Sequence, residues 1–163
     1  MSYRLAGFTG TTIALISFQL TLKGLALYLE KTVPEAKARG VAIGYDGRFN
    51  SLTFAKYTAA TFLHLGFNVF FFPTIVPTPL TSFAVLGENC VASVMITASH
   101  NPKDDNGYKV YWENSAQVSR NQFRRSNHKP FSQAGAVDKC SGKERMDSSF
   151  ILMQLHPIPS ALG

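Results

Sequence analysis

Residues 91–112, VASVMITASHNPKDDNGYKVYW, join a short apolar run, a polar loop and an alternating run. The apolar run of residues 91–96 is typical of a buried strand, and the loop after it brings a hydroxyl, an imidazole and an amine together. Residues 108–112 alternate as a strand does, but they begin only about ten residues later, too close for a helical crossover. We therefore expect this second strand to return antiparallel at a sheet edge, with Asn106 and Gly107 in the turn.

The segments before this stretch alternate between helix-like and strand-like patterns. In chain order they predict a helix over 12–31, a strand over 40–45, a helix over 51–63, a strand over 68–72 and a helix over 80–86. Either Asn50 or Ser51 is expected to cap the second helix. Apolar strands joined by helices indicate an α/β fold with a mainly parallel sheet of about four strands, an antiparallel edge strand and helices on both faces.

The carboxyl ends of parallel strands carry the ligand-binding loops of such sheets, and both Asp46-Gly47-Arg48 and Ala98-Ser99-His100 follow predicted strands. A serine is a weak nucleophile by itself, but beside the backbone amides of a tight loop Ser99 could hold an attached or transferring phosphate. Lys109 would add a positive charge, and His100 a route for the proton. Spacing alone leaves an alternative open, in which Ser99 satisfies loop amides, His100 is a turn residue and Lys109 is a solvated edge-strand charge.

Composition and charge divide the chain in two. The 163 residues are 45% hydrophobic and 16% charged, which fits one folded domain. The net charge of +6 is uneven, because residues 119–163 hold seven Lys and Arg against three Asp and Glu. That segment has no sustained hydrophobic period, so we expect a domain over 1–117 and a divergent, poorly ordered tail over 118–163. Its scattered charges lack interleaved aromatic side chains, which argues against nucleic-acid binding.

The cysteines and the N-terminal segment indicate the setting of the protein. Cys90 and Cys140 have neither the spacing of a zinc site nor that of a disulfide framework, which favours a reducing, cytoplasmic environment. Gln19 and Lys23 interrupt the N-terminal apolar stretch well short of a membrane span of about 20 residues. We therefore expect an amphipathic helix there and no membrane partner.

Several motifs resemble one enzyme family. TASHNP at residues 97–102, followed by DNGYKVY at 105–111, resembles the phosphoserine loop of the α-D-phosphohexomutase superfamily. GYDGR at 44–48 resembles the G-x-D-x-R loop of that family, VPTP at 76–79 its T-P loop, and residues 25–31 the end of its first helix. The resemblance covers residues 12–117, the first domain of the family, and is strongest to the subgroup of phosphoglucomutase-2/phosphopentomutase and glucose-1,6-bisphosphate synthase.

The resemblance implies that Ser99 carries a phosphoryl group and gives it to a sugar phosphate, with Mg²⁺ bound through that phosphate. It implies roles for further residues: His100 and Lys109 assist proton transfer and orient the phosphate, and Asp46, Arg48 and Asn101 support the phosphate and its loop. The implied substrates are hexose- or pentose-1-phosphates, and glucose-1,6-bisphosphate is an implied phosphoryl donor. The implied activity is that of an isomerase of carbohydrate metabolism.

The sequence also departs from the family pattern. Residues 1–12 do not contain the recognisable G-T-[AS]-G-x-R segment and lack the arginine of that motif. The aspartate-rich metal loop, the G-E-x-S sugar loop and the C-terminal phosphate loop are absent from the sequence. We therefore expect a truncated first-domain fragment with little or no turnover alone. The alternative is a non-catalytic binding or regulatory module whose basic tail contacts an acidic partner.

Overall fold

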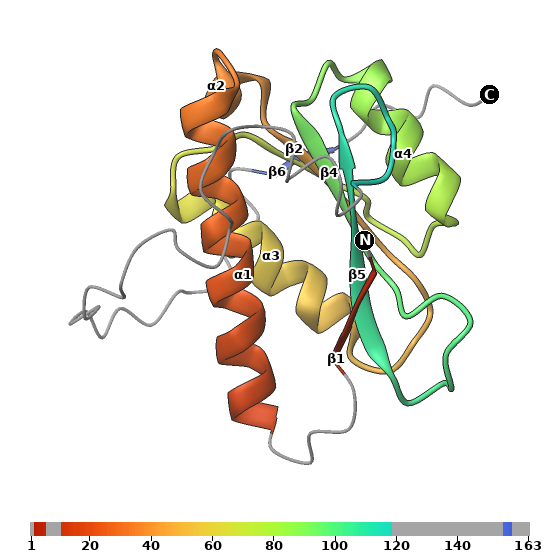
Figure 1. Ribbon diagram of the computed structural model, residues 1–163. Coiled ribbons are helices and arrows are strands. Elements are labelled where there is room, and N and C mark those ends of the chain that lie inside the picture. The colour runs from red at the N-terminus through yellow and green to blue at the C-terminus, as the bar shows by residue number, and fades with distance from the viewer. Residues whose placement is uncertain (1, 6–10, 119–154, 158–163) are drawn as a thin grey trace.

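The computed structural model describes residues 2–5, 11–118 and 155–157. Within these residues the chain forms six strands and four helices (Figure 1). In chain order they are β1 Ser2–Leu5, α1 Thr11–Thr32, α2 Ala36–Arg39, β2 Val41–Tyr45, α3 Ser51–His64, β3 Val69–Phe71, α4 Thr78–Gly87, β4 Ala92–Ile96, β5 Asn106–Trp112 and β6 Leu155–Pro157.

The strands form one sheet in the order β1-β5-β4-β2-β3-β6. Strands β4, β2, β3 and β6 run parallel, whereas β5 is antiparallel to β4 on one side and to β1 on the other. The register places Val41 of β2 between Ala92 of β4 and Val69 of β3. The four inner strands confirm the predicted α/β fold and the predicted antiparallel return of β5. Strands β1 and β6, which the sequence pattern does not predict, add one strand at each side.

Helices cover both faces of the sheet, as the sequence predicts (Figure 1). Helices α1 and α3 pack on one face, and α4 packs on the other. Alternation along β2 divides its side chains between two cores, because Val41 and Ile43 join the α1 and α3 side while Ala42 packs with Ala84 and Val85 of α4. Burial on both faces explains why these strands are continuous apolar runs in the sequence.

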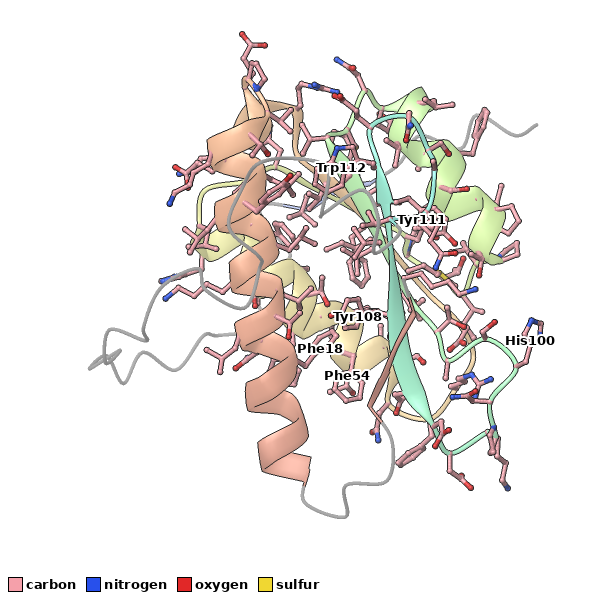
Figure 2. The ribbon with its side chains drawn as sticks, in the orientation of Figure 1. Phe18, Phe54, His100, Tyr108, Tyr111 and Trp112 are labelled. Atoms are coloured by element: carbon pink, nitrogen blue, oxygen red, sulfur yellow. The ribbon has the colours of Figure 1, made fainter. Side chains whose placement is uncertain are left out.

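The larger core lies between α1, α3 and the sheet. Buried residues of α1 recur at three- and four-residue steps, which turns one stripe of the helix inward. They are Phe18, Leu22, Leu25, Ala26 and Leu29. The Phe18 ring meets Phe54 of α3 and Tyr108 of β5 edge to face, with ring centroids 5.0 and 5.4 Å apart (Figure 2). Such edge-to-face contacts stabilise the packing of both helices on β5 in addition to the stabilisation that comes from burying apolar area.

Gly44 near the end of β2 allows α4 to lie close to the sheet. A Cβ atom at this position would collide with the Thr81 hydroxyl of α4 and would lie 2.9 Å from a methyl carbon of Val76. The backbone of β2 therefore approaches α4 more closely than a side chain would permit. This close approach fixes α4 beside the carboxyl end of β2, where the loops of the site lie.

The turn before β5 differs from the prediction. Strand β5 begins at Asn106, so Asn106 and Gly107 are buried strand residues and do not form the turn. The reversal uses residues 98–105, with hydrogen bonds from Asn101 N to Ala98 O and from Asp105 N to Pro102 O. An Asn-Gly pair is typical of a two-residue hairpin, but the nine-residue loop here leaves it free to enter the strand.

The start of α3 and the predicted linker before β2 also differ from expectation. Asn50 precedes α3 with a φ of 67° and makes no capping bond through its side chain, and the Ser51 hydroxyl donates to Asp46 instead. The linker contains the short helix α2, which ends at Arg39 and is followed by Gly40 with a positive φ of 73°.

The predicted tail and the expected absence of a membrane span are only partly covered by the described residues. Of the predicted tail over 118–163, only Val118 and residues 155–157 are described, so its expected lack of order lies outside the described residues and the division at residue 117 stays a prediction. Among the described helices, none is both long enough and apolar enough to cross a membrane.

Candidate active site

Two loops meet at the carboxyl ends of β2 and β4. The pairing of Tyr45 with Ile96 ends both strands at the same level, and the amide of Asp46 donates to the Ile96 carbonyl at 3.1 Å. Residues 46–50 follow β2, and residues 97–105, here called the serine loop, lead from β4 to β5. The two segments that the sequence analysis placed at one edge of the sheet therefore adjoin one another.

Ser99 lies in the serine loop with a φ of 57°, a left-handed conformation that is uncommon for a residue with a Cβ atom. Its amide donates to the Thr97 hydroxyl at 3.0 Å. Lys109 reaches the same point from β5, because alternation turns Tyr108 and Val110 toward the core and Lys109 toward the opposite face. The Lys109 Nζ donates to the Ser99 Oγ at 3.4 Å. The hydroxyl and the ammonium predicted from the sequence are thus neighbours.

The guanidinium of Arg48 joins the loop after β2 to the serine loop. Its Nε donates to Asp46 Oδ2 at 3.1 Å. Its two terminal nitrogens donate to four backbone carbonyls: those of Pro102 at 2.6 Å, Asp105 at 3.3 Å, Ser99 at 2.8 Å and Asn101 at 3.0 Å. Arg48, a predicted site residue, therefore contacts the loop that carries Ser99, and Asp46, also predicted, contacts Arg48.

Two buried polar side chains extend this arrangement, and the sequence pattern does not place either of them in the site. The Ser51 hydroxyl donates to Asp46 Oδ1 at 2.6 Å. The Asn106 side-chain amide donates to the Phe49 carbonyl at 2.9 Å and lies 3.4 Å from the Ser51 Oγ. Ser51 is completely buried and Asn106 is 9% exposed. The sequence marked Asn106 only as half of an Asn-Gly pair, which is a turn signal.

His100 and Asn101 occupy the outer part of the serine loop. His100 is exposed and points away from the sheet (Figure 2). No hydrogen bond or ion pair joins its imidazole to any residue that the structure describes, so the imidazole is not brought against Ser99 or Lys109. Asn101 contributes its carbonyl to Arg48 and its amide to the turn at Ala98.

An open depression of about 640 Å³ lies between the two loops, a volume within the range of small-molecule sites. Its lining combines backbone, aromatic and charged groups from both loops: Asp46, Gly47, Arg48, Phe49, Asn101, Lys103 and Asp104. The depression therefore adjoins the serine loop on the side where Asn101 and Lys103 lie.

The Cys90 thiol is also a potential nucleophile, but it is unsuited to catalysis. Burial raises the pKa of the Cys90 thiol to about 12, and the charge of Glu88 adds to this rise while that of Arg39 opposes it. Because the thiolate is the reactive form, a buried thiol with this pKa is inert at neutral pH. Ser99 is accordingly the better candidate nucleophile.

The carboxylates near the serine loop do not form a cation site. Within residues 2–5, 11–118 and 155–157, no group of three or more His, Cys, Asp or Glu side chains could hold a metal ion. Both carboxylate oxygens of Asp46 already accept hydrogen bonds from Arg48 or Ser51. Mg²⁺ prefers several oxygen ligands, so the described residues alone do not fit a magnesium site.

Sequence comparison relates this chain to known proteins. A family model described as phosphoglucomutase/phosphomannomutase, alpha/beta/alpha domain I, matches residues 10–125. The chain is 54% identical over 96 residues to the probable phosphoribomutase of Schizosaccharomyces pombe, covering 59% of this chain and 16% of that protein. It is 45% identical over 104 residues to human phosphopentomutase and 47% identical over 103 residues to mouse glucose 1,6-bisphosphate synthase, covering 60% of this chain and 17% of each relative.

Solved structures with a similar fold include a phosphoglucomutase/phosphomannomutase family protein of Burkholderia thailandensis, with a TM-score of 0.59 and 23% identity. Another, from Thermus thermophilus, has a TM-score of 0.64 and 25% identity. Each alignment covers 74% of this chain and 26% of the solved chain. The chain thus spans about a sixth of the length of the curated relatives it matches and about a quarter of these solved structures.

Proposed function

Because this chain belongs to the phosphoglucomutase/phosphomannomutase family through its domain I, we propose that Ser99 accepts a phosphoryl group from one sugar phosphate and returns it to another sugar oxygen. The reaction class is intramolecular phosphotransfer, an isomerase activity. The observation that carries the proposal is the 3.4 Å approach of the Lys109 ammonium to the Ser99 hydroxyl. The names of the relatives, which include phosphopentomutase and glucose 1,6-bisphosphate synthase, support pentose- and hexose-phosphates as the substrates.

The chemical step exchanges one phosphate ester for another. The Ser99 Oγ forms a bond to the phosphorus of a donor such as glucose-1,6-bisphosphate, and the bond from that phosphorus to the sugar oxygen breaks. The hydroxyl proton leaves Ser99, and the departing sugar oxygen takes up a proton, so that the products are phosphoserine and a sugar monophosphate. The reverse step transfers the group to a different sugar hydroxyl. Catalysis of such transfers is mainly positioning and charge stabilisation.

Lys109 and His100 have separate roles in this proposal. The Lys109 ammonium stabilises the charge that develops on the transferring oxygens, because it already lies beside the Oγ. His100 accepts the proton from Ser99, which requires the exposed imidazole to turn toward the Ser99 hydroxyl when substrate binds. Asp46, Arg48 and Asn101 support the serine loop through the hydrogen bonds described above.

We include Mg²⁺ as the cofactor, held through the phosphate on Ser99. The ion would neutralise charge on the phosphoryl group when bound. The described residues offer no carboxylate cluster for it, so the chain without a phosphorylated serine is expected to bind Mg²⁺ weakly. We place the protein in the cytoplasm, a setting that suits its free buried thiol at Cys90.

The proposal is tested by incubating the 163-residue chain with glucose-1,6-bisphosphate and Mg²⁺ and mapping the phosphate by mass spectrometry. We expect phosphorylation of Ser99, no labelling of Ser99→Ala, and labelling slowed about 10²-fold in Lys109→Ala, the loss typical of one charge-stabilising group. Ser82→Ala, a change in a helical serine away from the site, serves as the control and should label normally. Phosphate on another serine, or labelling that survives in Ser99→Ala, would overturn the proposal.

A further inference from the structure

The hydrogen bonds of Arg48 occupy the whole donor set of its side chain. A guanidinium carries five N–H groups. One points to Asp46, and the four terminal ones match the carbonyls of Ser99, Asn101, Pro102 and Asp105. An arginine that recognises phosphate presents free donors in a planar fork. Arg48 has none left for a substrate in this arrangement.

Asp46 and its neighbours fix the direction of this guanidinium. Asp46 Oδ2 accepts from the Arg48 side chain, and Oδ1 accepts from the Arg48 amide at 3.1 Å and from the Ser51 hydroxyl at 2.6 Å. Ser51 is in turn approached by Asn106, which also donates to the Phe49 carbonyl. The hydrogen bonds thus run without interruption from the first residue of β5, through the start of α3, to the serine loop.

The loop that these bonds enclose contains an unfavourable backbone conformation. Ser99 is left-handed, and a residue other than glycine keeps such a conformation only where the surrounding structure holds it there. The hydrogen bond from the Ser99 amide to the Thr97 hydroxyl lies within the serine loop, whereas the bonds from Arg48 come from the loop after β2. The Arg48 bonds therefore act on the main chain of the loop from outside it, whereas Lys109 contacts the Ser99 side chain.

From this geometry we infer that Arg48, Ser51 and Asn106 are positioning residues, which hold Ser99 in its left-handed conformation without touching the substrate. Ser51 and Asn106 act through Asp46, and Arg48 acts directly on the carbonyls of the loop. The importance of this positioning for phosphoryl transfer rests on the proposed function of Ser99. The positioning itself can be measured in the absence of any reaction.

The first test is hydrogen exchange of the full chain, read by mass spectrometry on peptides that cover residues 97–109. Arg48→Lys keeps the charge but cannot reach four carbonyls from one nitrogen, so exchange in this segment should rise by at least about fivefold, the effect of losing one hydrogen bond. Ser51→Ala, a milder change, should raise it in the same segment.

Arg39→Lys is the matched control for this exchange test. Arg39 also donates to two backbone carbonyls, those of Asn89 and Cys90, and it pairs with Glu113, all of them away from the serine loop. Its substitution should leave exchange over residues 97–109 unchanged. Equal exchange of that segment in Arg48→Lys and in Arg39→Lys would overturn the inference.

The second test separates positioning from substrate binding by varying the concentration of glucose-1,6-bisphosphate in the labelling reaction. Arg48→Lys should lower the maximal rate of Ser99 phosphorylation by about tenfold or more, in the manner of a misplaced reacting group, with an unchanged half-saturating concentration. Lys109→Ala should raise that concentration as well. A raised half-saturating concentration in Arg48→Lys would mean that Arg48 binds the donor, which overturns the inference. If unmodified chain is not labelled at all, the proposed function fails, and the exchange test still decides the positioning role.

Discussion

Ser99 combines the hydroxyl proposed for catalysis with a backbone conformation that its side chain disfavours. At a φ of 57° the Cβ atom is crowded, and glycine is the residue that avoids this crowding. We expect Ser99→Gly to be more stable than Ser99→Ala by about 1 kcal/mol, because alanine keeps the Cβ atom and glycine removes it. Urea unfolding of both variants measures the difference. Equal midpoints would show that the left-handed conformation is not strained in this loop.

At the level of single residues, the sequence predicts that Ser99 and Lys109 lie close together, but it does not predict which residues support the loop. Ser99 and Lys109 are ten positions apart, and their meeting follows from a loop and a return strand that the pattern shows. Ser51 and Asn106 are 55 positions apart, and neither carries a local signal for the other. Their roles depend on which strands become neighbours, so only the tertiary structure identifies them.

Among the secondary-structure elements, the packing of β2 against α4 depends on one missing side chain. Gly44→Ala should lower the free energy of unfolding by about 1–3 kcal/mol, the usual effect of overpacking, because the added methyl collides with Thr81. Gly87→Ala is the matched control: it lies at the end of α4, and an added Cβ would meet nothing within 4 Å. That change should stabilise the protein by about 0.5–1 kcal/mol. Thermal unfolding of both variants is the measurement, and similar effects of the two substitutions would contradict the packing argument.

The sequence predicts the order of helices and strands because each element carries its own period. The helix over 12–31 matches α1, and the strand over 40–45 matches β2 within a residue. Local rules fail where tertiary hydrogen bonding competes with them. Asn106 and Gly107 have turn propensity, yet Asn106 gains buried bonds to Phe49 and Ser51 by entering β5. The polar linker before β2 likewise concealed α2, since four residues are too few to show a period.

For the molecule as a whole, two buried tyrosines and one buried cysteine make the stability fall as the pH rises. Burial raises the pKa of Tyr45, of Tyr111 and, to about 12 from its ordinary 9.0, of Cys90. The folded state therefore holds these protons more tightly than the unfolded chain does. The contribution of these three groups to the free energy of unfolding is complete below their unfolded pKa values and is lost as the pH rises above those values.

We consequently expect the free energy of unfolding to fall as the pH rises above about 9, where the unfolded Cys90 thiol ionises. In Cys90→Ala the decline between about pH 9 and pH 11 should be shallower, with the part due to the two tyrosines remaining. Urea unfolding across this pH range, on both proteins, gives the two slopes. Parallel slopes would show that the thiol takes no part in the alkaline loss of stability.

The way in which Arg48 contacts the serine loop also bears on how the site can evolve. Four of the five hydrogen bonds of its side chain end on main-chain carbonyls, which every amino acid provides, proline included. Replacement of Lys103 or Asp104, both exposed, therefore removes none of these bonds. Mutations can accumulate at these outward-facing positions and alter what the loop recognises while the loop keeps its path. Under the proposed function, substrate preference would then change without any change in the hydrogen bonds that hold the loop of Ser99.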